Sequence, residues 1–314
     1  MIRGVAATPA ARVVVIHPER RAQRVLARLA RSTLCRIDVL AEVPAAADAC
    51  ADAIVIVDAK LACAQPALRE RAARAWIAVP GEGLEAASPD AVAVLLAAGW
   101  DHVIAHPMPL LAEELLATTQ KLLRDECFGL DKYMAWGASI SSFALDNALE
   151  RADAVALLAR ELVPVGLPER ISSLVGVIAD ELLANAIYAA PVDETGARFR
   201  ARESREASRA LVGRDVVTLR WATDARYLAI EVRDRWGSLD PIPIGRRLAA
   251  SKNHARPEDG MGLPLAYACA NQLVLGVAPA QLTEIVALLD VRYKPTDLAR
   301  NASFHVFTTT SAPS

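Results

Sequence analysis

The sequence predicts an α/β protein of two domains, with a parallel sheet in the first and a mixed, mainly antiparallel sheet in the second. Its 314 residues exceed the size at which a single hydrophobic core usually stops growing. Along the chain, aliphatic runs alternate with helical stretches over about the first 125 residues, whereas helices precede most strands afterwards. Hydrophobic residues make up 54% of the chain and aromatic residues only 5%, so aliphatic side chains must fill both cores.

The first half repeats an aliphatic run followed by a helical stretch. Amphipathic or apolar helical patterns cover residues 20–31 and 110–124, and the second of these begins after Pro109. Strands are predicted at 13–16, 53–57, 75–79 and 102–105. Because right-handed crossovers place helices on both faces of a parallel sheet, uninterrupted aliphatic strands separated by helices favour that arrangement.

The periodic pattern lapses between residues 128 and 137. Gly129 ends a helical pattern there, and Gly137 precedes a new segment. We therefore place one domain at residues 1–127 and the second at residues 128–314.

Two helices, at 150–162 and 168–189, are predicted early in the second half, and both end before prolines. Residues 192–214 are charged and nearly free of large apolar side chains, so we expect a loop or an exposed arm. Strands are predicted at 139–145, 216–221, 228–232, 273–277, 284–291 and 304–308, with helices at 244–250 and from the glycine-rich turn to about 271. This order predicts an α/β sandwich.

Composition excludes several classes of function. The net charge of −2 and the pI near 6.2 supply no broad positive field, so nucleic acid is not an expected partner. The five cysteines form no CxxC pair, so neither a zinc cluster nor a disulfide framework is expected. We find no secretory signal pattern and no apolar run of membrane-spanning length, so we expect a cytoplasmic protein with no membrane association.

Two polar side chains interrupt the apolar helix predicted over 168–189. Glu181 and Asn185 are four residues apart and therefore share one helix face. Oxygen ligands suit Mg²⁺, which takes few protein groups together with substrate phosphates, and a carboxylate nearby can accept the proton of an attacking hydroxyl. The alternative is an exposed polar strip.

A second polar position ends the strand predicted at 228–232. That strand runs into Asp234, after which come Trp236, Gly237 and Ser238. A carboxylate here can accept a hydrogen bond from an exocyclic amino group, and a glycine lets the backbone approach a flat base. An ordinary turn has the same pattern.

A glycine-rich turn precedes the last predicted helix. Gly260 and Gly262 are followed by Leu263 and Pro264. Glycines before a helix N-terminus expose backbone N–H groups to phosphate, and the helix dipole favours the anion, although an ordinary turn is the alternative. The sequence has neither the GxxxxGK[ST] pattern nor a strand-borne GxGxxG, so P-loop and dinucleotide sites lack support.

In this order, the three segments resemble the N, G1 and G2 boxes of the GHKL ATPases, the superfamily of histidine-kinase-like ATPase domains. The resemblance covers about residues 138–310 and implies ATP and Mg²⁺ as cofactors. By this resemblance Asn185 would bind Mg²⁺, Glu181 would be the catalytic base and Asp234 would hold the adenine amino group. The nucleotide-binding residues it implies are Asn185, Asp234, Trp236, Gly237, Gly260, Gly262 and Leu263.

The second box departs from the family pattern. GHKL families usually carry DxGxG, whereas Trp236 and Ser238 occupy the two glycine positions here and Gly237 falls between them. Two interpretations remain open, either that Trp236 stacks on adenine or that nucleotide binding is weakened. Between the second and third boxes, Lys252, His254 and Arg256 form either a lid that contacts phosphate or a solvated loop.

The short spacing and the Glu181 position look more like anti-sigma-factor serine kinases than like sensor histidine kinases. No upstream helix offers the usual phospho-acceptor His, so autophosphorylation on His is not expected. The resemblance implies a cytoplasmic, bacterial-type signalling regulator that phosphorylates Ser or Thr on a partner protein. The alternative is a non-catalytic nucleotide-binding adaptor that acts through protein contacts.

Residues 11–125 resemble a response-regulator receiver domain, which implies a flavodoxin-like fold with Asp58 at the phospho-acceptor position. The surrounding pattern departs from the family: His17 replaces the acidic pair that would hold Mg²⁺, Pro80 replaces a Thr or Ser, and His106 replaces a Lys. Without the metal pair, an incoming phosphoryl group would lack charge neutralisation. We therefore expect a pseudo-receiver with a degenerate phospho-acceptor, which serves homodimerisation or docking to a signalling partner.

Overall fold

The computed structural model describes residues 11–81, 84–167, 169–251, 262–292 and 302–310. The chain divides into two compact units, Met1–Asp125 and Glu126–Ser314. The boundary expected from the sequence, after residue 127, lies two residues further along. Both units combine helices with strands, so the predicted α/β class is confirmed.

A parallel sheet with the strand order β2-β1-β3-β4-β5 forms the centre of the first unit, as the aliphatic runs predict. Its strands are β1 Arg12–Ile16, β2 Arg36–Leu40, β3 Ala53–Asp58, β4 Ala75–Val79 and β5 His102–Val103. Every residue of β3 is buried, as expected for a central strand that is covered on both faces.

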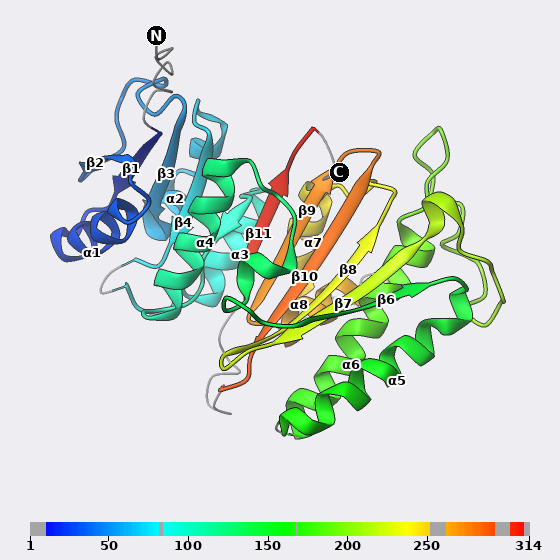
Figure 1. Ribbon diagram of the computed structural model, residues 1–314. Helices are drawn as coiled ribbons and strands as arrows, with labels where there is room; N and C mark the ends of the chain where they lie inside the picture. Colours follow the sequence, from blue (N-terminus) through cyan, green and yellow to red (C-terminus); the bar gives the residue numbers. More distant parts are fainter. Residues whose placement is uncertain (1–10, 82–83, 168, 252–261, 293–301, 311–314) are drawn as a thin grey trace, which may run out of the picture. The chain divides into compact units, whose positions relative to one another are not determined.

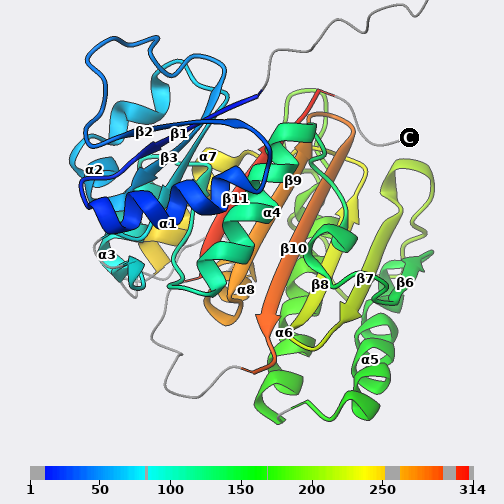
Figure 2. The same ribbon diagram turned by 60° about the vertical axis from the view of Figure 1, so that its left-hand side comes forward.

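The helices of the first unit are α1 Arg20–Arg31, α2 Ala59–Ala64, α3 Pro89–Ala97 and α4 Leu110–Arg124. Helices α1 and α4 contact each other (Figure 2). Their apolar side chains share one core with alternate residues of the strands, such as Val13 and Val15, or Ile54 and Ile56. Helix α2 contacts α3 and strands β3 and β4. The alternation of buried side chains along each strand therefore supplies two apolar faces.

The second unit is built on a mixed sheet with the strand order β11-β9-β10-β8-β7-β6. Strand β11 runs parallel to β9, and the other neighbouring strands are antiparallel, so the predicted mainly antiparallel sheet is confirmed. The strands are β6 Ile140–Leu145, β7 Val217–Thr223, β8 Tyr227–Asp234, β9 Gln272–Ala278, β10 Leu282–Asp290 and β11 Ser303–Thr308.

Helices cover one face of this sheet (Figure 1). They are α5 Arg151–Leu162, α6 Glu169–Ala184, α7 Pro241–Ser251 and α8 Gly262–Cys269. Helix α6 contacts β7, β8 and β10, while α8 contacts β9 and β10. Helix α6 continues into a π-helical turn, η6 Asn185–Ala189, so together they account for the long helix predicted over 168–189.

A buried group of charges lies on the sheet of the second unit. Glu231 and Glu284 are 0% and 1% exposed. The Arg233 guanidinium donates to Glu284 Oε2 over 2.6 Å and to Glu231 Oε1 over 3.2 Å, and Arg220 Nη1 donates to Glu231 Oε2 over 2.8 Å. The Gly129 N–H donates to both oxygens of Glu284 over 3.1 Å, so the segment that follows the unit boundary is fastened to this face.

Burial raises the pKa of Glu231 to about 8, and the neighbouring carboxylate of Glu284 adds to this effect. The two arginines act in the opposite direction and lower the pKa. Burial also raises the pKa of Tyr133 well above its usual range, helped by the two carboxylates. The titratable groups that act on Glu231 are Glu284, Arg233 and Arg220, whereas Cys127 and Asp131 act on Tyr133. Glu231 is therefore mainly protonated at neutral pH.

One helical stretch among the described residues, Ile171–Ala189, has the length and apolar composition of a membrane-spanning segment. The expected absence of membrane association stays a prediction. The most apolar window of this helical stretch is 56% buried within the fold. Core helices meet the same criteria, so this helix indicates neither the presence nor the absence of a membrane.

Candidate functional site

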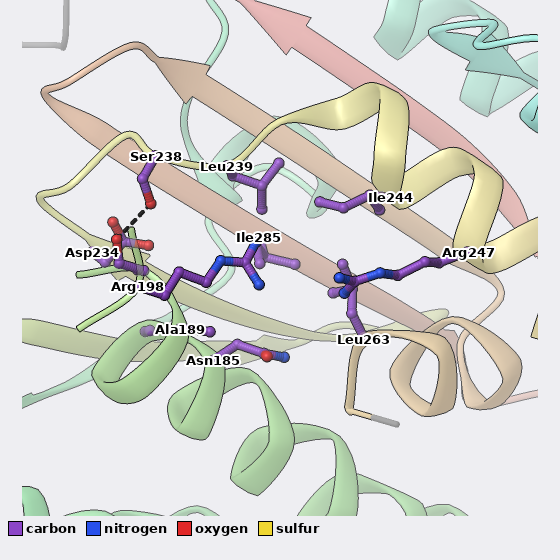
Figure 3. Close-up of a pocket in the computed structure, with 12 residues that line it drawn as sticks. Asn185, Ala189, Arg198, Asp234, Ser238, Leu239, Ile244, Arg247, Leu263 and Ile285 are labelled. Carbon is purple, nitrogen blue, oxygen red and sulfur yellow. Dashed lines mark hydrogen bonds between the residues drawn. The ribbon is translucent and has the colours of Figure 1, made fainter. Parts of the chain in front are cut away.

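A pocket lies between α6, α7, α8 and the sheet of the second unit (Figure 3). It encloses about 520 Å³, part of which is open to solvent. Its lining residues are Asn185, Ala186, Ala189, Ala190, Arg198, Asp234, Ser238, Leu239, Ile244, Arg247, Leu263 and Ile285.

The π-helical turn at the end of α6 places Asn185 in this pocket. Asn185 is the first residue of the turn, and its carbonyl accepts from the Ala190 N–H over 2.9 Å. Its side-chain Nδ2 is buried with no hydrogen-bond partner among the described residues. Since buried polar groups are nearly always paired, this amide is available to a ligand. π-Helical turns inside α-helices are frequent at functional sites.

The start of α8 packs directly against the two polar residues of α6. A Cβ at Gly262 would overlap Glu181 Oε2 and lie 3.1 Å from Asn185 Nδ2. A glycine at this position therefore lets the backbone of α8 meet both side chains. Glu181 itself lies one helical turn before Asn185 and is not among the residues that line the pocket. Two of the three predicted segments thus meet here.

Asp234, from the second of the predicted segments, forms another part of the pocket wall. It ends β8, is 5% exposed and accepts a hydrogen bond from the Trp236 N–H over 2.8 Å. Burial raises the pKa of Asp234 to about 6, against backbone hydrogen bonds from Trp236 and Gly237 that lower it. The carboxylate is therefore mainly ionised at neutral pH, and its second oxygen can accept from a ligand.

Trp236 lies outside this pocket and lines a neighbouring hollow with Arg214 and Gly237. The Arg214 guanidinium carbon lies 4.3 Å from the centroid of the Trp236 ring, and the Phe199 ring meets it edge-on at 6.0 Å. The indole thus already has two neighbours within the protein. Stacking of Trp236 on adenine stays a prediction.

Gly237 has a structural reason to be glycine. Its φ is +57°, and a Cβ there would overlap the Ala278 carbonyl oxygen and lie 2.8 Å from the Ala280 nitrogen. The open side of this glycine thus faces the turn between β9 and β10, whereas the sequence pattern suggested a ligand base in that space.

Gly260, Lys252, His254 and Arg256 lie outside the described residues. Leu263, the first residue after Gly262, lines the pocket, and its place at a phosphate-side turn stays a prediction.

No family model matches the sequence, and no curated protein matches it either.

Several lining residues were not singled out from the sequence. Arg198 and Arg247 carry charges into the pocket, while Ser238 donates to the Ala190 carbonyl over 2.5 Å at its edge. Arg198 belongs to a stretch with many arginines, and nothing in the sequence distinguishes it from the others. Ile285 lies in β10, where alternation along the strand places it beside the pocket, opposite to Glu284.

In the first unit, Asp58 is enclosed at the end of β3. It is 2% exposed, its Oδ1 accepts from the Lys60 N–H over 3.2 Å and it caps α2. His17 Nε2 lies 4.0 Å from the same oxygen, and a Cβ at Gly81 would stand 2.8 Å from it. His106, at the position where receivers carry a Lys, pairs with Glu114 over 2.9 Å. Among the described residues, no group of three His, Cys, Asp or Glu could hold a metal ion.

Proposed function

We propose that the second unit binds ATP with Mg²⁺ in the manner of a GHKL domain, and that the chain is a signalling regulator. The observation that carries this proposal is the convergence of three distant segments. Asn185, Asp234 and Leu263 line one pocket, and Gly262 packs against Glu181 and Asn185. The fold of the unit supports the same proposal, because helices cover one face of a mainly antiparallel sheet.

The pocket suits a flat base with an amino group. The buried carboxylate of Asp234 can accept from that group, as its ionised form has no donor of its own. Leu239, Ile244 and Ile285 supply apolar surface on which a base can lie. Adenine has both features, a flat apolar ring and an exocyclic amino group.

The residues at the other side of the pocket fit a magnesium ion. Mg²⁺ usually takes one or two protein oxygens and completes its shell with phosphate oxygens and water, and the Asn185 side-chain oxygen can be one of these. When bound, the ion neutralises charge on the phosphate oxygens. Glu181, one turn away, would accept the proton of a partner's Ser or Thr hydroxyl as its oxygen bonds to the γ-phosphorus and ADP leaves.

Replacement of Asp234 by Asn is expected to weaken Mg-ATP binding by about 10- to 100-fold, because an amide replaces a charged acceptor worth about 1.5–3 kcal/mol. Calorimetric titration of the full chain measures the change. Binding to the unaltered protein should also weaken as the pH falls below about 6, since protonation converts the Asp234 acceptor into a donor.

Asp153→Asn, at an exposed position of α5, is the matched control and should leave binding unchanged. Equal affinities of the Asp234→Asn variant and the unaltered protein would remove Asp234 from the site. Absence of nucleotide binding by the unaltered protein would overturn the proposed function itself.

A second variant separates a kinase from an adaptor. If the chain is a kinase, Glu181→Gln should lower Mg-dependent ATP turnover or phosphotransfer by about 100-fold or more, while ATP affinity changes only a few-fold. Glu169→Gln, at an exposed position of the same helix, controls for the loss of a charge. Tight ATP binding by the unaltered protein without turnover in the presence of candidate partners would favour the adaptor.

For the first unit we propose a receiver-like, flavodoxin-like module that works through protein contacts, including contacts with a second copy of the chain. What supports this is the parallel sheet together with the enclosure of Asp58 by His17, Gly81 and the Lys60 backbone. A carboxylate that is 2% exposed and caps a helix is poorly placed to accept a phosphoryl group. The proposed regulator acts in the cytoplasm on a protein partner and contacts neither nucleic acid nor membrane.

A further inference from the structure

The segment between η6 and β7 is held against the second unit by specific bonds, although it contains no long helix or strand. We call residues 192–212 the arm. The Arg200 residue is 6% exposed, and its guanidinium pairs over 2.6 Å with Asp215, which lies two residues before β7. The Tyr188 hydroxyl donates to the Arg205 carbonyl over 3.2 Å, and Asn147 Nδ2 donates to Ser208 Oγ over 3.0 Å. The arm is therefore positioned by bonds at several points along its length.

This anchoring brings an arginine of the arm into the pocket. Arg198 precedes Arg200 by two residues, and its side chain extends from the Asp234 side toward Ile285 in the middle of the pocket (Figure 3). Arg247 enters from α7 on the other side and lies over Leu263. Two guanidinium groups from separate elements thus point into the same space.

The charges of the lining are unequal. Among the described residues that line the pocket, Asp234 is the one acidic side chain, whereas Arg198 and Arg247 are both cationic. Arg198 makes no side-chain hydrogen bond or ion pair with any described residue. A guanidinium presents its donors in a planar fork that matches two oxygens of a phosphate group.

We propose that Arg198 and Arg247 bind the phosphate groups of the ligand and make the pocket select polyphosphorylated nucleotides over nucleosides. The proposal rests on the proposed function, since it assigns one end of the nucleotide to Asp234 and the other to the two arginines. Neither arginine belongs to the three segments on which the nucleotide site was predicted. The arm thus contributes directly to the specificity of the site.

Calorimetric titration of the full chain with adenosine, AMP, ADP and ATP, each with Mg²⁺, tests the proposal. Affinity should rise at least tenfold from adenosine to ATP and fall as the salt concentration rises. Arg198→Ala and Arg247→Ala should each weaken ATP binding at least tenfold and change adenosine binding less than about threefold. Arg198→Lys keeps the charge without the planar fork and should lie between these limits.

The chain offers a matched control for each variant. Arg202 is an exposed arginine of the same arm, and Arg246 is the exposed neighbour of Arg247 on α7. Neither lines the pocket, so Arg202→Ala and Arg246→Ala should keep the ATP affinity of the unaltered protein. Thermal unfolding of all variants shows whether a loss of ATP affinity reflects misfolding. If one alanine variant is misfolded, Arg198→Lys and the alanine variant that folds test the proposal.

Inorganic tripolyphosphate separates this proposal from the proposed function. If adenosine and ATP bind with equal affinity, the role of the two arginines is overturned and the nucleotide site stands. If no adenine compound binds, the nucleotide site is overturned. Binding of tripolyphosphate then tests whether the two arginines form an anion site. Binding of tripolyphosphate that both alanine variants lose supports the anion site, and its failure to bind the unaltered protein overturns it.

Discussion

Replacement of Gly237 by alanine is expected to destabilise the second unit by at least about 3 kcal/mol. Gly237 has a φ of +57°, and an added Cβ would overlap the Ala278 carbonyl oxygen and stand 2.7 Å from the Gln281 nitrogen. These are backbone atoms of the tight turn between β9 and β10, so they cannot move aside as a flexible side chain would. Denaturation of the full chain by urea measures the loss of unfolding free energy.

Gly213 provides the matched control for this change. Its φ is +61°, close to that of Gly237, yet nothing lies within 4 Å of the place where a Cβ would stand. Gly213→Ala should therefore cost only about 1–2 kcal/mol, the penalty of a left-handed backbone with a side chain. Equal costs at the two positions would show that backbone conformation alone requires Gly237, and that the turn between β9 and β10 yields.

The second large effect is expected at the buried charges of the sheet. Glu284→Gln should lower the unfolding free energy by about 3–5 kcal/mol, as is typical when one partner of a buried ion pair is removed. The change leaves the Arg233 guanidinium and the Gly129 N–H without their charged acceptor. Urea denaturation near pH 6 is the appropriate measurement.

Glu231→Gln should behave in the opposite way, although Glu231 is equally buried. Glutamine resembles the protonated acid that predominates at neutral pH, so we expect a cost below about 1 kcal/mol at pH 6. Comparable losses for Glu231→Gln and Glu284→Gln would show that Glu231 is not the protonated one of the two carboxyl groups.

The pH dependence of the same variant gives a second readout. The pKa of Glu231 is raised from 4.5 to about 8, so the folded state holds a proton that the unfolded chain releases earlier. This group's contribution to stability is complete below about pH 4.5 and is lost as the pH rises to about 8. The loss is at most about 5 kcal/mol, since one pH unit corresponds to about 1.36 kcal/mol. Glu231→Gln should remove this slope, whereas parallel curves would contradict the assignment.

Long periodic segments of this fold could be predicted from the sequence, and short ones could not. The predicted helix over 110–124 coincides with α4, and the predicted strand over 75–79 coincides with β4. Strand β2 was missed because it lies at the edge of its sheet and carries exposed and half-exposed side chains, so it has no continuous aliphatic run. Helix α2 has six residues, too few to show a helical period.

Parts of the site depend on contacts that a sequence does not show. Spacing of four residues places Glu181 and Asn185 on one helix face, but their contact with Gly262 arises only when α8 packs on α6. Arg198 enters the pocket because the arm is anchored through Arg200, a pairing between residues in different structural elements. Glu231 lies in a strand whose alternation suggests a solvated face, yet its side chain is fully buried.

The π-helical turn after α6 also bears on how this site could have arisen. Such a turn holds one residue more than an α-helical turn, so it is equivalent to a single-residue insertion within a helix. Residues beyond it are rotated by about 100° relative to an uninterrupted α-helix, while those before it keep their register. The Ala190 carbonyl, which accepts from Ser238, is the first group after the turn. A chain one residue shorter here would keep α6 but present a different helix end to the pocket. Gain or loss of one codon would therefore change which groups line the pocket.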